Sequence, residues 1–493
     1  MRAFDRLTQP AIAAVLALLA TLGGVAACSR SDGPTQGSGS ASRVELQFWT
    51  LALAPFEDYI RERIAAFEAE NPGVKVVWSD VPYEAIDRKL MAAAAAGRAP
   101  DLVNMADRTF ARFVAMDAMV DLKPLLPGDV SATYLSGALR LPSLGDRLLG
   151  LPWYLTTQTV LLNEPVLTAG GLTPATLGRD WRTLQRQSLD FHERTGNYLF
   201  SIPLGFEADL PFMMLADGVV PFTEDRSGPQ PRLRANLLDP AVVAFLEGWV
   251  ATFRSGAMPA EAVTGGNSHQ PQLYKERRLA LINTGPNFLK QIQRDSPTVF
   301  QGTQVEPAIT GSLNRAHIAV MVLSVTNQSR NPELAARLAW FMTSAQSQLL
   351  LCRRAVVLPS VTAALEDPLF AFPSVEPLSD PAAEAERRIQ YARALSARAL
   401  RDAVAFTPSL EAWPDLRRAF EDGFKRVLLD GRDLRATLQD IQTTWDGILA
   451  LVPGTMDAVP RPAAVPARQP PPSGQPSTQR STPASTTGQG SPA

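Results

Sequence analysis

Residues 44–49 read VELQFW, and this run decides the fold together with VKVVW at 74–78 and DLVN at 101–104. The first run alternates apolar and polar side chains as a β-strand does, and the other two are short and mainly apolar. Residues 56–67 and 84–96 lie between them, carry apolar side chains at helical spacing, and are each followed by a glycine-containing stop. The order strand, helix, strand, helix, strand predicts an α/β fold in which helices cover parallel strands.

The same alternation of strands and helices continues toward the C-terminus. Ligands of open parallel sheets bind outside the carboxyl ends of the strands. This rule draws attention to Trp49, Thr50 and residues 105–108, which follow the first and third predicted strands. Further strands are expected at 151–163 and 279–283, and further helices at 240–254, 332–351, 416–429 and 434–449.

The composition is that of an ordinary globular protein. The 493 residues include 47 basic and 49 acidic side chains, which gives a formal net charge of −2, and 45% of the residues are hydrophobic. These values exclude a wholly disordered chain, a coiled coil and a polytopic membrane protein, and they argue against a nucleic-acid binder. With 3 His and 2 Cys, a Cys-rich zinc site is excluded, and we expect no metal, no cofactor and no disulfide between Cys28 and Cys352. Cys352 is expected to be a buried small hydrophobe.

The N-terminus has the layout of a secretory signal. A short positive start precedes an apolar run at 11–22, which is too short to favour a membrane-spanning helix. Residues 25–28 (VAAC) resemble the bacterial lipobox, which implies cleavage after residue 27 and a lipid on Cys28. The alternatives are an ordinary signal peptide or an uncleaved anchor, in either case with an incidental cysteine. Residues 28–42 are predicted to be a flexible tether that holds the folded part at the outer face of a membrane or in the periplasm.

The C-terminal residues 453–493 are rich in proline, serine and threonine and contain no aromatic residue. Such a segment buries too little apolar area to offset its chain entropy. We predict that it is disordered, with contact to a cell wall or partner as the alternative.

Several motifs follow one another in a fixed order along the chain. They are Phe48-Trp49-Thr50, the FE-plus-NPGVKV segment at 67–76, KL to APDLV at 89–103, LPW to AGGL and Trp181 at 151–181, and YKE to GP at 274–286. Through these motifs, most of residues 44–451 resembles the sugar-type extracellular solute-binding proteins of bacterial ABC importers (family 1, maltose-binding-protein-like).

The resemblance implies a two-lobed periplasmic-binding-protein fold of type II, each lobe with a mixed, mostly parallel sheet flanked by helices. The first lobe is expected at 43–154 plus 308–357 and the second at 155–307 plus 358–452. Ligand would bind in the cleft at the hinge, and the lobes would close around it. The implied partners are a sugar-like solute and the membrane subunits of an ABC permease, and the protein is expected to be a monomer.

A sugar offers hydroxyl edges and flat C–H faces. Its edges need charged or amide partners, and its faces need aromatic side chains. Loops at predicted strand ends supply both kinds of residue. The substrate-binding residues we predict are Trp49, Thr50, Asp107, Arg108, Trp153, Tyr154, Thr156, Glu207, Asn287, Phe288 and Trp413.

By resemblance, Asp107 and Arg108 bond sugar hydroxyls and Trp413 stacks on a sugar ring. Thr156 stands where the maltose-binding branch carries a carboxylate, and Glu207 lies in a loop similar to one that brings a carboxylate from the second lobe. The alternatives are a solvated helix cap at Asp107, a solvated loop charge at Glu207, and plain packing for the aromatic residues.

Other functions stay open at this point. A glycoside-binding sensor or scaffold lipoprotein would share the fold. A glycoside hydrolase could use Asp107 and Glu207 as acid and base, if the two carboxylates lay about 5 to 9.5 Å apart. No catalytic motif supports an enzyme, and the three histidines lack metal spacing. Disaccharides, glucosylated osmolytes and glycerol phosphodiesters are all candidate solutes, and the acidic residues favour a neutral polyol.

Overall fold

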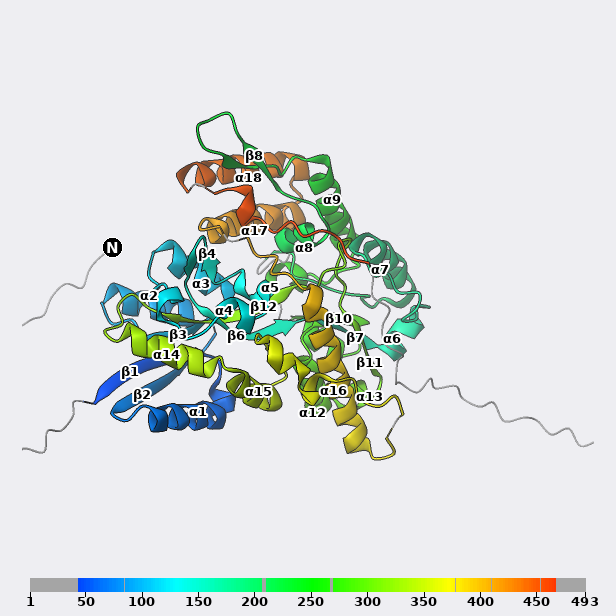
Figure 1. Cartoon of the computed structure of the whole chain (residues 1–493). Helices are drawn as coiled ribbons and strands as arrows, with labels where there is room; N and C mark the ends of the chain where they lie inside the picture. The colour runs from blue at the N-terminus through cyan, green and yellow to red at the C-terminus, as the bar shows by residue number, and fades with distance from the viewer. Residues whose placement is uncertain are drawn as a thin grey trace, which may run out of the picture. The chain divides into compact units, whose positions relative to one another are not determined.

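A computed structural model describes residues 43–466 except 84, 206–209, 267–268, 377, 409 and 453, and for Arg108 it describes only the backbone. Cys28, Glu207 and the predicted signal and tether lie outside the described residues. The described elements build two separate main sheets with helices packed on them (Figure 1).

The larger sheet has six strands in the order β13-β6-β12-β3-β1-β2. The predicted strands at 44–49, 74–78 and 101–104 are confirmed, and β1 pairs in parallel with both β2 and β3. β12 returns antiparallel between β3 and β6, so the sheet is mixed rather than mostly parallel. The strands are β1 (Val44–Leu51), β2 (Val74–Val81), β3 (Leu102–Met105), β6 (Leu151–Thr157), β12 (Ile318–Val325) and β13 (Leu358–Pro359).

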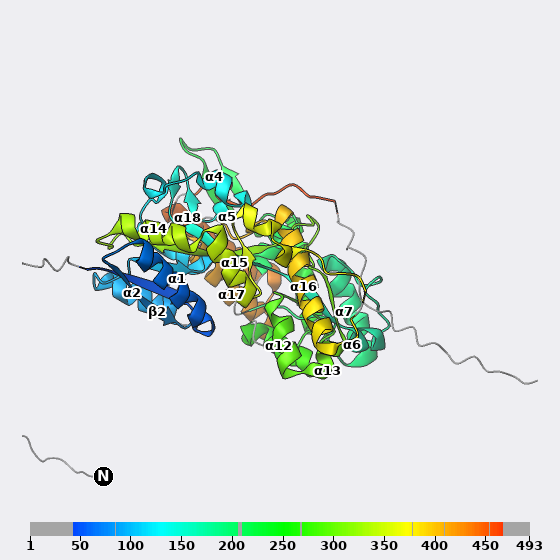
Figure 2. The same ribbon diagram turned by 60° about the horizontal axis from the view of Figure 1, so that its bottom comes forward.

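Five helices accompany this sheet, and α1, α14 and α15 pack against one another (Figure 2). The single helix expected over 332–351 is two helices, because the Ser344 side chain caps a new one by accepting the Ser347 N–H. Cys352 is fully buried in the core, as expected, and burial raises the pKa of its thiol to about 12. The helices are α1 (Glu57–Glu70), α2 (Ile86–Ala95), α3 (Asp107–Ala115), α14 (Pro332–Met342) and α15 (Ala345–Arg354), with the short α4 (Val130–Thr133) and α5 (Ser136–Leu139) and the hairpin β4 (Ser143–Leu144) and β5 (Arg147–Leu148) nearby in sequence.

The smaller sheet has three strands in the order β10-β7-β11, all paired antiparallel. These are β7 (Thr159–Asn163), β10 (Leu281–Thr284) and β11 (Thr303–Pro307), and α16 packs on the sheet (Figure 1). The helices of this part are α6 (Glu164–Ala169), α7 (Trp181–Thr195), α8 (Leu210–Ala216), α9 (Pro240–Arg254), α10 (Glu261–Thr264), α11 (His269–Lys275), α12 (Asn287–Asp295), α13 (Pro297–Gln301), α16 (Pro381–Ala399), α17 (Trp413–Leu429) and α18 (Leu434–Leu451), with the hairpin β8 (Phe222–Asp225) and β9 (Arg232–Ala235).

The chain passes between the two sheets at two segments that matter for the site. The single strand expected at 151–163 is in fact β6 of the larger sheet and β7 of the smaller one, and the residue between them is Gln158. We call Gln158 the short crossing. The return from β11 to β12 is longer and comprises residues 308–317, which we call the long crossing.

The predicted lobe boundaries lie close to these crossings and stay a prediction. Leu358 and Pro359 follow the boundary placed at 357, and they pair with β6 in the larger sheet. Among the described residues, no helix is long and apolar enough to cross a membrane.

The prediction of disorder from residue 453 is wrong as far as residue 466. Residues 454–466, which we call the C-terminal strap, pack on the fold: Val459 is 2% exposed, and the Leu233 N–H donates to the Gly454 carbonyl. Further along, the Val465 N–H donates to the Leu313 carbonyl in the long crossing. Composition alone missed these contacts because a proline-rich segment can still be ordered by a surface that the rest of the chain provides.

Candidate functional site

A pocket lies where the chain passes between the two sheets. Two adjoining hollows share the lining residues Gln158, Phe212, Gln270, Asn283 and His317, and together we call them the crossing pocket. The inner part is the more enclosed and has a cavity volume of about 50 Å³, and the outer part has a cavity volume of about 330 Å³. Residues from both sheets and both crossings therefore converge on one cavity.

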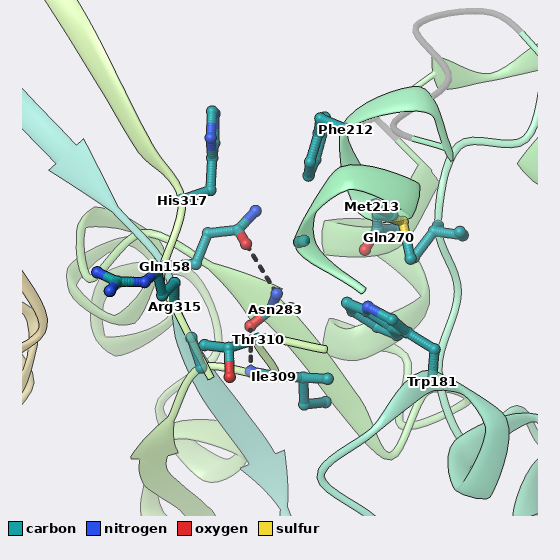
Figure 3. Close-up of a pocket in the computed structure, with 13 residues that line it drawn as sticks. Gln158, Trp181, Phe212, Met213, Gln270, Asn283, Ile309, Thr310, Arg315 and His317 are labelled. Atoms are coloured by element: carbon teal, nitrogen blue, oxygen red, sulfur yellow. Dashed lines mark hydrogen bonds between the residues drawn. The ribbon is translucent and has the colours of Figure 1, made fainter. Parts of the chain in front are cut away.

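Two amide side chains tie the crossings together at the base of this pocket (Figure 3). Asn283, on β10, donates from Nδ2 to Gln158 Oε1 at 2.8 Å. Its own Oδ1 accepts from the Ile309 N–H at 3.3 Å. Amides both donate and accept, so Gln158 and Asn283 can brace the backbone and still offer hydrogen bonds to a solute.

His317 ends the long crossing and stands on the pocket wall. Its ring stacks on Phe212 of α8 with centroids 4.9 Å apart and planes 15° from parallel. The Phe406 N–H donates to His317 Nδ1 at 3.3 Å. Burial lowers the pKa of His317, although the Asp107 carboxylate and a hydrogen bond with the Val404 backbone oppose this shift. The imidazole is therefore neutral at pH 7 and presents a flat, weakly polar surface.

The inner part also has an apolar wall. Trp181, Ile202, Met213 and Ile309 line it together with Phe212. Trp181 begins α7, and its ring packs 6.0 Å from that of Trp249. The Trp181 indole Nε1 is buried and has no hydrogen-bond partner within the described part of the chain. Flat rings beside amide groups form the combination that a sugar-like solute requires.

Two of the predicted site residues lie at or beside this pocket. Thr156 lines its outer part. Asp107 begins α3, accepts a hydrogen bond from the Thr407 hydroxyl at 2.9 Å, and lies near enough to His317 for its charge to oppose the lowering of that ring's pKa by burial. Glu207 and the side chain of Arg108 lie outside the described residues, although Glu207 directly precedes the helix that carries Phe212 in the sequence.

The first-strand residues have structural contacts. Thr50 is fully buried, donates to Asp80 Oδ1 at 2.6 Å and accepts from the Trp78 indole at 2.8 Å. Trp49 is half-buried, with the Lys89 ammonium 4.6 Å from its ring centroid. Neither lines the crossing pocket.

The remaining predicted aromatic residues fill hydrophobic cores. Trp153 is fully buried, with its ring 6.2 Å from that of Phe48, and Tyr154 on the same strand is 7% exposed. Trp413 is 7% exposed in the core around α17 and lies 6.4 Å from Phe222.

At the start of α12, Phe288 packs against Tyr274 with ring centroids 6.0 Å apart. Asn287 precedes it and accepts from the Val356 N–H. None of Trp153, Tyr154, Asn287, Phe288 and Trp413 lines the crossing pocket. The structure thus places Thr156 on the lining of the pocket and Asp107 in the neighbourhood of His317, and it leaves these five residues outside the lining.

The pocket-lining residues that sequence reasoning missed are Gln158, Trp181, Phe212, Gln270, Asn283 and His317. For Gln158 a signal was available, because the polar run Thr-Thr-Gln interrupts an otherwise apolar strand pattern. The others come from distant segments, and no local pattern distinguishes them. Among the described residues, no group of three or more His, Cys, Asp or Glu side chains could hold a metal ion.

Comparison with known families gives one match that covers most of the folded chain. The family described as bacterial extracellular solute-binding protein matches residues 53–349. A periplasmic-binding protein from Synechococcus sp. MITs9220, described as a candidate oligosaccharide binder, has a TM-score of 0.74 and 30% identity, over 82% of this chain and 99% of that one.

More distant relatives share the fold. The GacH receptor of Streptomyces glaucescens, solved unliganded and with acarbose, has a TM-score of 0.64 and 18% identity over 82% of this chain and 98% of its own. The sugar-binding protein MalE of Xanthomonas citri has a TM-score of 0.62 and 18% identity over 83% and 98%. An uncharacterized lipoprotein of Streptomyces antibioticus, from the region 5′ of oleD, is 25% identical over 362 residues, or 72% of this chain and 77% of that protein.

Proposed function

The chain belongs to the bacterial extracellular solute-binding protein family, and from this premise we propose that it is the carbohydrate receptor of an ABC importer. The observation that carries the proposal is the crossing pocket, in which two braced amides face aromatic and apolar walls at the junction of two sheets. The relatives described as oligosaccharide- and sugar-binding proteins support a carbohydrate as the solute.

Capture would work by lobe closure. A solute that bonds to groups attached to both sheets favours the arrangement in which those groups are close together. The shift toward the closed form can be no larger than the difference in the solute's affinity for the two forms. The membrane subunits of the permease would then receive the solute from the closed receptor.

Within the pocket, we assign the sugar edges to Gln158 and Asn283 and one sugar face to Phe212, with Thr156 and Asp107 at the margin. Neutral amides bind hydroxyl groups without burying a charge, which lowers the desolvation cost. The predicted contacts through Trp49, Thr50, Arg108 and Glu207 stay proposals for a more closed form. Trp153, Tyr154, Asn287, Phe288 and Trp413 would need a change of packing to reach a solute here.

The location completes the proposal. Cleavage after residue 27 and a lipid on Cys28 would anchor a monomer to a membrane through the tether at 28–42, with the folded part in the periplasm or at the outer cell surface. The relationship to a Streptomyces lipoprotein supports this anchor. The lobes would divide near 154, 307 and 357.

The hydrolase alternative gains no support from the described residues. The Asp107 carboxylate accepts a hydrogen bond from the Thr407 hydroxyl. A hydrolase would need Asp107 and Glu207 as its acid and base, and Glu207 lies outside the described residues. Binding without chemistry needs only the contacts of the crossing pocket. We therefore propose a receptor rather than an enzyme, and no observation singles out a sensor or scaffold role.

The test is a thermal-shift screen of the chain from Ser29 onward against neutral disaccharides, larger oligosaccharides and glycosides, followed by calorimetric titration of each hit. We expect at least one carbohydrate to raise the melting temperature and to be recovered unchanged after prolonged incubation. Asn283→Ala should weaken that binding about tenfold or more, since two hydrogen bonds at the pocket base are lost. The exposed Gln439→Ala on α18 is the control. Release of a cleaved product would contradict the receptor proposal.

A further inference from the structure

The inner part of the crossing pocket combines apolar walls with hydrogen-bond donors. Ile202, Phe212, Met213 and Ile309 supply the apolar surface, and Trp181 lies on the wall across from Gln158 (Figure 3). An ordinary sugar hydroxyl matches such a wall poorly, because it must both accept and donate a hydrogen bond when it is buried.

The first donor is Trp181 Nε1. The side chain is 5% exposed, and its N–H has no hydrogen-bond partner among the residues that the structure describes. A buried donor without a partner costs free energy, and a ligand oxygen that accepts from it recovers that cost. Met213 and Gln270 lie beside Trp181 (Figure 3), and the long, unbranched Met213 side chain can rotate to let such an oxygen approach.

The second donor is the amide nitrogen of Gln158. Its Oε1 already accepts from Asn283, and Figure 3 shows its Nε2 pointing away from Asn283, toward the His317 and Phe212 side chains. The Asn283 oxygen is likewise engaged, with the Ile309 N–H. The amide oxygens at the pocket base therefore serve the fold, and an N–H group faces the cavity.

The described residues that line the inner part offer no free charge to pair with an anion. Among the described residues that line the inner part, none is a carboxylate, and the only guanidinium is that of Arg315. Arg315 turns away from Trp181 and Phe212 (Figure 3) and donates to the carbonyls of Ala463 at 2.5 Å and Asp402 at 3.2 Å. Burial of an unpaired carboxylate or phosphate here would be costly.

We propose that the inner part of the crossing pocket is a subsite for the N-acetyl group of an amino sugar. The carbonyl oxygen accepts hydrogen bonds from Trp181 Nε1 and Gln158 Nε2, and it carries no proton that would need an acceptor. The methyl group lies against Met213, Ile202 and Ile309. The inference rests on the proposed function, because it names the class of carbohydrate that the same site would take.

The test uses two disaccharides with the same linkage and ring configuration, N,N′-diacetylchitobiose and cellobiose. At carbon 2 of each ring, the first carries an acetamido group and the second a hydroxyl. Calorimetric titration of the chain from Ser29 onward should show the acetylated sugar binding at least about tenfold more tightly. Equal or tighter binding of cellobiose would overturn the inference.

A pair of tryptophan variants tests the donor. Trp181→Phe keeps an aromatic ring but removes the N–H, and it should weaken binding of the acetylated sugar by about five- to fiftyfold. Trp249→Phe makes the same change at a second buried indole, which also has no partner in the described ranges but does not line the pocket, and it should leave the affinity unchanged. Equal effects of the two variants, with matched melting temperatures, would overturn the role of Trp181.

The outcomes separate this inference from the proposed function. If other carbohydrates bind and no N-acetylated sugar does, the subsite is wrong and the receptor proposal stands. If no carbohydrate binds at all, both are wrong. Binding of the acetylated sugar with loss in Trp181→Phe alone supports both.

Discussion

The two crossings between the sheets are built in opposite ways. The short crossing is one residue, Gln158, and the strands on either side of it are paired on both edges: Thr157 with Ile318, and Thr159 with Thr284 and Pro307. The long crossing spans residues 308–317 and lies outside the named strands. Its order comes from contacts with residues far away in the sequence.

Three hydrogen bonds join the long crossing to the C-terminal strap. The Val465 N–H donates to the Leu313 carbonyl, Asn314 Nδ2 donates to the Val465 carbonyl at 3.0 Å, and Arg315 Nε donates to the Ala463 carbonyl. The difference teaches that the wall at the short crossing is fixed by the sheets themselves. The long crossing is instead held by bonds to other segments of the chain, among them the strap that follows α18.

The largest effect on this comparison should follow removal of the strap. A chain that ends at Leu451 loses the burial of Val459 and the three bonds to the long crossing. We expect the free energy of unfolding to fall by about 2–4 kcal/mol, from one buried aliphatic side chain and several hydrogen bonds. Urea denaturation followed by tryptophan fluorescence measures this change.

A chain that ends at Pro466 is the matched control, since it keeps every described residue of the strap. It should unfold at the same urea concentration as the longer chain. Equal stability of the two truncated chains would mean that the strap contacts contribute nothing to the long crossing.

Single substitutions in the untruncated chain should have a smaller effect on stability, and they should distinguish the two crossings by their rates of amide hydrogen exchange. Arg315→Gln removes the guanidinium bonds to Ala463 and Asp402, and amide hydrogen exchange in residues 308–317 should become about tenfold faster, equivalent to about 1.4 kcal/mol. Asn283→Ala removes the brace on Gln158, yet exchange in β6 and β7 should change less, because the ladder bonds remain. Faster exchange at β6 and β7 in Arg315→Gln would contradict the independence of the two walls.

The smallest effect is a pH dependence at the end of the long crossing. Burial lowers the pKa of both His317 and His269 in the folded chain, relative to about 6.5 when unfolded. As the pH falls below about 6.5, the unfolded state therefore takes up protons first, so stability is complete above this pH and declines toward the lower folded pKa.

His317→Asn should flatten that decline without abolishing it, because His269 still titrates. Urea unfolding at a series of pH values above and below 6.5 measures the slope for both chains. Identical slopes would show that protonation of His317 is not linked to folding.

Much of the fold could be predicted because its signals are local. The alternation in Val44–Trp49 and the helical spacing of Ile60, Ile64 and Phe67 each lie within a few turns of chain. They identified the strands β1–β3 and the helices between them. The resemblance then supplied the two-lobed architecture, which the family match and the solved structures confirm.

The site was harder to predict because tryptophans in cores and in binding sites look alike in a sequence. Trp153 and Trp413 fill cores, whereas Trp181, which no motif singled out as a contact, lines the crossing pocket. The break at Gln158 was hidden because two short strands of different sheets follow each other without a turn residue.

The sequence by itself determined the class of fold, the family and the burial of Cys352, because hydrophobic periodicity and ordered motifs act over short distances. Only the tertiary structure decided which polar residues converge on a pocket and that residues 454–466 are ordered. His317 follows Gln158 by more than a hundred residues in the chain. These two residues and Asn283 come close together because the chain leaves the larger sheet after β6 and returns to it at β12. The strap is ordered by bonding partners and apolar surface that exist once the other elements have packed.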